Sequence, residues 1–384
     1  MNENNKFNGL NKELFRLYCI EHSDSLLEST KFQNKVLTSK DYAKRLASIE
    51  GFVNDLLSNK ETPFVSTINK AGQNFYRPGT LANRYIRSMP VFIKIVTLLS
   101  PKYEYSERLN VFVNACNALG LLHSNERLDW QPIRFDPKYT SLHYYNASVA
   151  EIFNELVKYI RNEWKVKKLQ LKFNDRETAA ESLYEEYCLY VDALFRKRAR
   201  LLVLRFDLGY KNPDANNIDI EDMQKDLFHL LRNMRHNRLF AFKMGHILKL
   251  EYGFGKGIHC HVVIFLDGTK RNNSSHVYFA EQMGKYWVDF VTKGRGNYWN
   301  VNATADHYDK LGKLGIGPIN WNDWKSRANL NEYVIGYLCK MDQYFRPKWG
   351  PKVKLIRRGD YPDIFAIPLG RPRMATAKIF WRPR

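Results

Sequence analysis

Two apolar, β-prone runs on either side of a glycine-rich loop constrain the fold of this chain more than any other segment. The runs cover residues 245–252 and 258–266, and the loop between them reads Gly-Phe-Gly-Lys-Gly. Short loops that contain glycine commonly join neighbouring antiparallel strands. The sequence therefore predicts a β-hairpin in which Tyr252 lies opposite Ile258, and with it an antiparallel sheet.

The segments around this hairpin predict an α+β domain. Residues 201–207 form a short apolar run typical of a strand, and residues 315–321 predict another strand. The order strand, helix, hairpin, helix, strand, helix is typical of an antiparallel sheet with helices packed on it. The helices predicted from helical spacing of apolar residues are 218–235, 275–292 and 323–345, the last stopped by Pro347.

The part of the chain before this domain is mainly helical in pattern and carries no chemical motif. Apolar residues recur at helical spacing in three segments, which are 91–99, 109–122 and 147–160. We therefore divide the chain into a mainly helical accessory domain (1–174), the α+β domain (175–345) and a basic C-terminal arm (346–384). The arm holds eleven Lys and Arg residues against two Asp, and it is rich in Pro and Gly.

Composition narrows the class of partner. The chain of 384 residues carries a formal net charge of +20, and a globular protein this basic usually meets a polyanion, nucleic acid first and a membrane surface second. No apolar run reaches the roughly 18 residues of a spanning helix, so we expect no membrane partner. The five cysteines form no CxxC pair and predict free thiols in a reducing cytoplasm.

The second strand of the predicted hairpin carries two histidines with metal-binding spacing. His259 and His261 are two residues apart, so both imidazoles project from one face of a strand. The predicted register places Glu251 directly opposite His259 on the same face. Two imidazoles and one carboxylate predict a site for a divalent metal, Mg²⁺ or Mn²⁺, although zinc hydrolases use similar ligands and paired strand histidines also occur without a metal.

The last predicted helix carries two tyrosines and a lysine on one stripe. Tyr333 and Tyr337 are four residues apart, and Lys340 follows three residues after Tyr337. Tyrosine needs activation to act as a nucleophile, which a nearby cation can supply. We predict Tyr337 and Tyr333 as nucleophiles assisted by Lys340, and Tyr344 as a third candidate. An amphipathic helix whose tyrosine rings simply pack is the alternative.

Taken together, these residues resemble the HUH superfamily of replication initiators and relaxases. Its pattern is an early apolar strand, a His–hydrophobic–His strand and a helix with two tyrosines and a lysine, found here at 201–208, 259–261 and 333–340. The two-tyrosine initiators of phages fit best, but many of them carry Lys where this chain has Gly336. The chain is also similar to the YagK/YfjJ C-terminal domain family of prophages and inovirus-like elements, over segments 248–268, 284–300 and 333–345.

The resemblance implies a HUH nuclease fold and a rolling-circle replication initiator. In such an enzyme the metal site binds the scissile phosphate of single-stranded origin DNA, and a tyrosine attacks the phosphorus atom. The products are a 5′-phosphotyrosine link and a free 3′-OH that primes replication, and the second tyrosine can later release a circle. We expect Tyr337 to make the first cut because Lys340 lies closer to it. The chain has no GxxxxGK[ST] phosphate loop, so a host helicase or supercoiling must expose the strand.

The candidate DNA-binding residues are basic side chains of the early strand, the hairpin loop and the start of the arm, namely Arg205, Lys256, Arg346 and Lys348. Three alternatives remain open at this point. A transposase or relaxase would use the same chemistry in another biological role. A DNA-binding regulator would keep the fold without cleavage, and RNA remains a possible ligand because stacking and charge distinguish the nucleic acids poorly.

Overall fold

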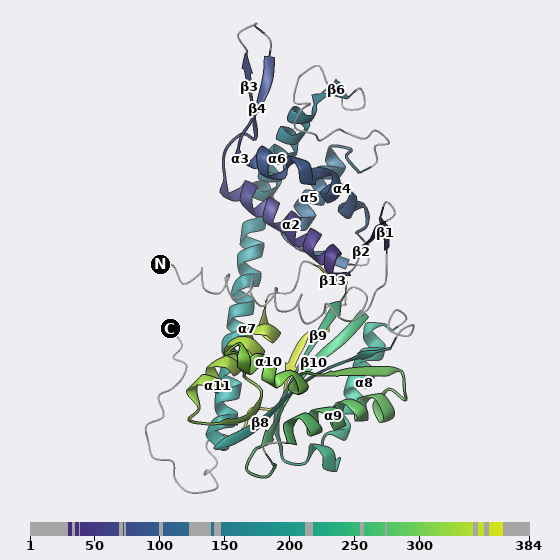
Figure 1. The fold of residues 1–384 in the computed structure, drawn as a ribbon, viewed down its shortest axis with the longest axis vertical. Coiled ribbons are helices and arrows are strands. Elements are labelled where there is room, and N and C mark those ends of the chain that lie inside the picture. The colour runs from purple at the N-terminus through teal and green to yellow at the C-terminus, as the bar shows by residue number, and fades with distance from the viewer. Residues whose placement is uncertain are drawn as a thin grey trace. The chain divides into compact units, whose positions relative to one another are not determined.

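The chain forms two compact units in a computed structural model (Figure 1). One unit, here the helical unit, is built from Leu27–Arg176 and Asp342–Lys348; the other, the sheet unit, from Glu177–Met341 and Trp349–Arg384. Among the described residues, no helix combines the length and the apolar character that crossing a bilayer requires. The structure describes residues 30–32, 35–37, 39–68, 72, 74–99, 103–122, 140–141, 147–211, 218–253, 257–272, 275–340, 345–348 and 353–363.

The helical unit packs its helices around a cluster of phenylalanines. The ring of Phe52 lies 5.8–6.0 Å from those of Phe92, Phe112 and Phe153, which come from three other helices. Its helices are α2 (Ser39–Ser58), α3 (Thr80–Tyr85), η1 (Ile86–Ser88), α4 (Met89–Thr97), α5 (Glu107–Ala118) and α6 (Val149–Val166). Its short strands are β1 (Thr30–Phe32), β2 (Lys35–Leu37), β3 (Phe64–Ile68), β4 (Asn74–Pro78), β5 (Tyr103–Tyr105), β6 (Thr140–Ser141), β7 (Ala147–Ser148) and β13 (Phe345–Pro347).

Polar caps fix where the helices of this unit begin. Ser148 and Glu151 form a reciprocal capping box at the start of α6, and Ser106 accepts a hydrogen bond from the amide of Leu109 at the start of α5. Helices α4, α5 and α6 overlap the three segments in which apolar spacing predicted helices. The apolar stripes of these helices supply the buried core of the unit.

The sheet unit has the α+β arrangement and the antiparallel sheet that the sequence predicted, with further strands at 296–300 and 356–358 and a further helix at 305–310. Its strands are β8 (Arg200–Tyr210), β9 (Lys243–Gly253), β10 (Gly257–Asp267), β11 (Gly296–Asn300), β12 (Gly317–Asn320) and β14 (Ile356–Arg358). Its helices are α8 (Ile220–Asn233), η5 (Arg238–Phe240), α9 (His276–Tyr286), the π-helix η7 (Trp287–Val291), η8 (Val301–Thr304), α10 (Ala305–Lys310), α11 (Trp324–Asn329), the π-helix η9 (Leu330–Ile335) and α12 (Gly336–Cys339), together with most of α7 (Leu169–Lys197).

The strands pair antiparallel in the order β11, β8, β10, β9, β14, and β12 pairs with β8 beyond the end of β11. In the central hairpin, Ile258 lies opposite Tyr252 and His259 lies opposite Glu251, so the predicted register is confirmed. Successive residues of each strand face opposite sides of the sheet, and this register therefore decides which side chains meet.

Helices cover both faces of this sheet (Figure 1). One face, here the apolar face, packs Cys260, Val262 and Ile264 of β10 against α8, α9 and η7. The other face, here the histidine face, packs Val263 and Phe265 against α7, η8, η9 and α12. The histidines precede Val263 on the same side of β10, at the end of the strand nearest the hairpin loop.

The structure differs from the sequence prediction in the last predicted helix, in the segments that follow it and in the position of the division between the two units. The helix predicted over 323–345 is wrong in its extent, because the chain passes through the π-helix η9 and leaves the helix at Lys340, which has extended backbone geometry. Residues 345–347 instead form β13, paired with β5 of the helical unit. Residues 356–358 of the predicted arm form strand β14 against β9. The division between the two units falls after Arg176, inside the continuous helix α7.

Candidate metal centre and nucleophile

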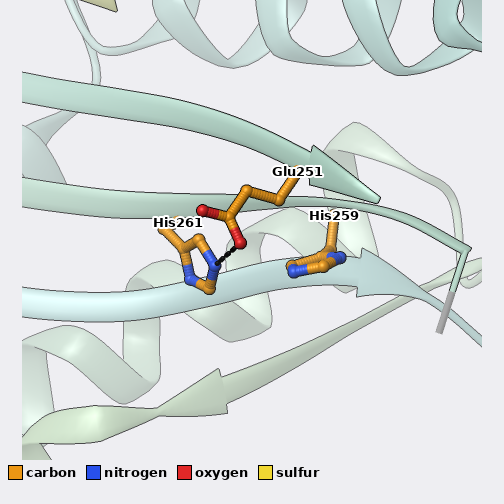
Figure 2. A group of neighbouring side chains, drawn as sticks. All are labelled: Glu251, His259 and His261. Atoms are coloured by element: carbon orange, nitrogen blue, oxygen red, sulfur yellow. Dashed lines mark hydrogen bonds and ion pairs between the residues drawn. The ribbon is translucent and has the colours of Figure 1, made fainter. Parts of the chain in front are cut away.

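The central hairpin brings Glu251, His259 and His261 together on the histidine face (Figure 2). All three are buried, and one ligand atom from each lies within 4.8 Å of the others, so the group could hold a metal ion. His261 Nε2 lies 3.3 Å from Glu251 Oε2, and the two imidazole rings lie nearly perpendicular with centroids 5.0 Å apart. The donor set fits a divalent cation, because carboxylate oxygen and imidazole nitrogen together suit Mn²⁺, Mg²⁺ or Zn²⁺.

Asp207 holds the second nitrogen of His261. Its Oδ1 lies 2.6 Å from His261 Nδ1, and β8 brings it there because Asp207 is the cross-strand partner of His261. A carboxylate in this position makes Nδ1 the protonated nitrogen, which leaves Nε2 as an acceptor for a metal ion. Sequence analysis missed Asp207, although a charged residue inside the apolar run LLVLRFD was a signal that it could have used.

The charges of the site favour both an ionised carboxylate and a bound cation. Burial alone would raise the pKa of Glu251, but Lys340 and His261 hold it well below its ordinary value. Burial alone would lower the pKa of His261, but Asp207 and Glu251 raise it above the ordinary value. The two carboxylates that favour a proton on His261 would likewise favour a metal cation beside it.

Tyr337 of α12 is the tyrosine that reaches this group. Its side chain is buried, and its hydroxyl lies 3.3 Å from His261 Nε2. Lys340 Nζ lies 3.8 Å from the centroid of the Tyr337 ring and 3.7 Å from Glu251 Oε1. The guanidinium of Arg205 lies 4.7 Å from the same ring centroid. A phenol oxygen thus lies beside the candidate metal ligands, with two cations against its ring.

A third cation is buried on the same face. Lys249 is 4% exposed, lies directly opposite His261 in the hairpin, and contributes to the low pKa of Glu251. Together with Arg205 and Lys340 it sets three cations against the carboxylates of Asp207 and Glu251. A phosphodiester that entered the site would bring negative charge close to these cations. Sequence analysis did not single out Lys249.

The other predicted residues lie elsewhere or outside the described residues. Tyr333 is half-buried in η9, with its ring centroid 5.0 Å from Lys313 Nζ. A π-helical turn takes more residues than an α-helical turn, so the four-residue spacing no longer aligns Tyr333 with Tyr337 as a plain helix would. Lys348 is exposed and, like Arg346, belongs to the segment that joins the helical unit. The predicted Lys256 and Tyr344 lie outside the described residues.

Two further expectations can be compared with the structure. Arg205, predicted to bind DNA, is 4% exposed and lies inside the site against Tyr337. Cysteines in the described part of the chain are buried free thiols, as predicted. Burial raises the pKa of the Cys260 thiol, which lies on the apolar face of β10, so this thiol is not a metal ligand of the group.

Comparisons with known proteins add no relative. No family model, no curated protein and no solved structure matches the chain. The geometry of its own residues therefore carries the functional inference.

Proposed function

We propose that this protein is a metal-dependent endonuclease and strand transferase of the HUH class, which cuts single-stranded DNA with Tyr337 as the nucleophile. The observation that carries the proposal is the 3.3 Å approach of the Tyr337 hydroxyl to His261 Nε2, within the buried group that also contains Glu251 and His259. A phenol, a candidate metal site and buried cations in one place are the parts that phosphodiester transfer to tyrosine requires.

The ligands in this proposal are Glu251, His259 and His261, with Mg²⁺ or Mn²⁺ as the ion. When bound, such an ion would polarise the phosphodiester and offset the negative charge of the transition state. Asp207 orients His261 through Nδ1, and Lys340 neutralises part of the charge on Glu251. Three protein ligands leave positions open for a phosphate oxygen or water.

Tyr337 exchanges one phosphate ester for another. Its phenol loses a proton, its oxygen forms a bond to phosphorus, and the bond from phosphorus to the 3′ oxygen of the preceding nucleotide breaks. That 3′ oxygen takes up a proton and becomes a free 3′-OH. Lys340 and Arg205 contact the Tyr337 ring and favour its phenolate during this step. One ester replaces another, so the link is reversible and strand transfer can follow cleavage.

The biological role in this proposal is rolling-circle replication initiation at a single-stranded origin. The free 3′-OH would prime synthesis, and Tyr333 would act in a later transfer once the origin is regenerated. The net charge of +20 suits a DNA ligand. A host helicase would expose the strand. Transposases and relaxases of mobile elements share the chemistry, so the cleaved sequence and its genetic neighbourhood would separate these roles.

Covalent trapping tests the proposal directly. The full chain is incubated with Mn²⁺ or Mg²⁺ and a pool of random-sequence single-stranded DNA labelled at the 3′ end. We expect a labelled protein adduct that resists denaturation, because the protein keeps the 5′ end of the downstream fragment. Mass spectrometry of the digested adduct should locate the nucleotide on Tyr337.

Matched variants make the result decisive. Tyr337→Phe keeps the ring and removes the nucleophile, so we expect no adduct and an unchanged folded state. Tyr333→Phe should still form the adduct. DNA attached to Tyr333 would reverse the assignment of the two tyrosines. The absence of any adduct with the wild-type chain on DNA of its own replicon would contradict an endonuclease and favour a non-cleaving DNA-binding protein.

A further inference from the structure

A solvent-exposed tryptophan lies beside the metal centre on the outer strand of the sheet. Asp207 of β8 is the cross-strand partner of His261 on one side and of Trp299 on the other. Directly opposed residues share a face, so Trp299 lies on the histidine face, two strand spacings or roughly 10 Å from His261. Although large aromatic side chains are usually buried, Trp299 is 59% exposed.

The neighbouring cross-strand pair on the same face contains a glycine, which leaves space between β11 and the histidines. Asn297 of β11 pairs with Gly209 of β8. A Cβ at Gly209 would lie 2.8 Å from Asn297 Oδ1 and 3.8 Å from the Cβ of His259. A side chain at position 209 would therefore make Asn297 shift and would occupy space between Asn297 and His259.

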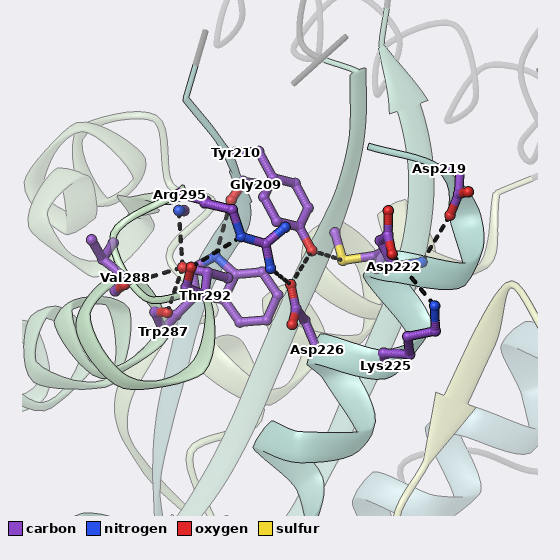
Figure 3. Close-up of polar contacts among 12 residues, drawn as sticks. Gly209, Tyr210, Asp219, Asp222, Lys225, Asp226, Trp287, Val288, Thr292 and Arg295 are labelled. Atoms are coloured by element: carbon purple, nitrogen blue, oxygen red, sulfur yellow. Dashed lines mark hydrogen bonds and ion pairs between the residues drawn. The ribbon is translucent and has the colours of Figure 1, made fainter. Parts of the chain in front are cut away.

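A polar network anchors the start of β11 to the sheet (Figure 3). The indole Nε1 of Trp287 donates to the Gly209 carbonyl at 2.9 Å, and the amide of Gly296 donates to Thr292 Oγ1 at 2.9 Å. Arg295 forms a 3.1 Å ion pair with Asp226. These contacts fix the strand that carries Trp299, so its indole is presented from a rigid element rather than from a loop.

We propose that Trp299 is a stacking platform for a base of the single strand, next to the phosphate bound at the metal centre. The proposal deepens the proposed function and rests on it. Three features select a nucleobase as the occupant. The ring is exposed, it lies one strand beyond Asp207, and the same face buries the cations Arg205, Lys249 and Lys340, which favour a phosphate beside it. Aromatic rings bind bases of any sequence by stacking.

The test separates stacking from charge. The probes are a 20-nucleotide oligothymidine and a fully abasic deoxyribose phosphate strand of the same length and charge, compared by competition in fluorescence anisotropy. Wild-type protein should prefer oligothymidine. Trp299→Ala should weaken oligothymidine binding by about 5- to 150-fold and leave abasic binding unchanged. Trp299→Phe should retain most of the preference because it keeps an aromatic face.

Trp324→Ala is the matched control. Trp324 is 66% exposed and begins α11, just after β12 pairs with the opposite end of β8, at Arg200. That end lies seven residues, or roughly 23 Å, from Asp207. We expect Trp324→Ala to bind both probes as wild type does. Mn²⁺ affinity should be unchanged in both tryptophan variants, which shows that the metal group remains intact.

The outcomes separate this inference from the proposed function. Equal binding of the two probes by wild type, or an unchanged preference in Trp299→Ala, would overturn the stacking role while adduct formation at Tyr337 still stood. A loss of preference in Trp324→Ala equal to that in Trp299→Ala would also overturn it. Failure of the wild-type chain to bind either strand would remove both proposals.

Discussion

The two faces of strand β10 differ although they are built from alternate residues of one segment. On the apolar face, Cys260, Val262 and Ile264 continue one core under α8 and α9. On the histidine face, Val263 and Phe265 do the same under α7, but His259 and His261 replace apolar side chains at the hairpin end. Burying those imidazoles costs free energy unless charged partners compensate.

The difference shows that the free-energy cost of burying the imidazoles of β10 falls at the candidate metal centre. The polar side chains lie together at one end of one face, where Asp207 pairs with His261 and Lys340 forms an ion pair with Glu251. The packing of the apolar face lies on the opposite side of the strand from the site. Function and stability can therefore be separated by substituting neighbouring residues of the same strand.

Substitution of the adjacent residues His261 and Cys260 tests most directly whether the two faces have separate roles. On the proposed function, His261→Ala should abolish detectable Mn²⁺ binding and lower the rate of DNA cleavage by about 1000-fold or more, equivalent to about 4 kcal/mol, because a candidate metal ligand is lost. Cys260→Ala on the opposite face should bind Mn²⁺ and cleave as wild type does. Metal titration and a cleavage assay measure both effects. Equal losses in the two variants would mean that the faces are not separable.

Packing on the apolar face should contribute strongly to the stability of the protein. Ile264→Ala removes a fully buried side chain and should lower the free energy of unfolding by about 2–5 kcal/mol. Denaturant unfolding followed by circular dichroism measures this loss. Phe228→Ala is the surface control, since Phe228 is exposed on α8 and should change stability by less than about 0.5 kcal/mol. A loss of Mn²⁺ affinity in folded Ile264→Ala would argue that packing on this face also tunes the site.

A smaller effect should follow from substitution of Asp207, which contacts the candidate metal ligand His261. Asp207→Asn keeps the shape but removes the carboxylate from His261 Nδ1, and we expect Mn²⁺ affinity to fall by about 10- to 100-fold. Calorimetric titration at fixed pH gives the affinity. Asp207→Glu serves as the control that retains the charge. Wild-type affinity in Asp207→Asn would show that His261 is oriented by other contacts.

His246 on the apolar face should make the stability of the protein depend on pH. His246 lies opposite Ile264 on the apolar face, and burial together with nearby Lys243 lowers its pKa to about 4. Below pH 6.5 the unfolded chain binds a proton that folded His246 does not take up until about pH 4, so stability falls as the pH drops through this window. Between pH 7 and 5 we expect a loss of at most about 2 kcal/mol from this residue.

Imidazole signals in an NMR titration, with unfolding curves at each pH, measure both quantities. His246→Asn should remove this part of the pH dependence while leaving the Mn²⁺ affinity unchanged. An unperturbed titration of His246 near pH 6.5 would contradict the predicted stability loss.

The hairpin, its register and the shared face of Glu251, His259 and His261 followed from the sequence alone. Alternation along a strand is a local property, and the short glycine-containing loop leaves few ways to pair the two runs. Helices with apolar stripes were predictable for the same reason, since spacing within one segment decides them. The helix boundary at Lys340 was not predictable, because the spacing of apolar residues does not reveal a π-helical turn.

Only the tertiary structure decided which distant residues complete the site. Asp207 reaches His261, and Trp299 reaches the same face, through strand pairings between segments far apart in the chain. Tyr337, rather than Tyr333, lies against His261 because of how the helix turns and packs over the sheet. Such pairings depend on the packing of the whole core, whereas the sequence by itself brought the candidate metal ligands together because they share one hairpin.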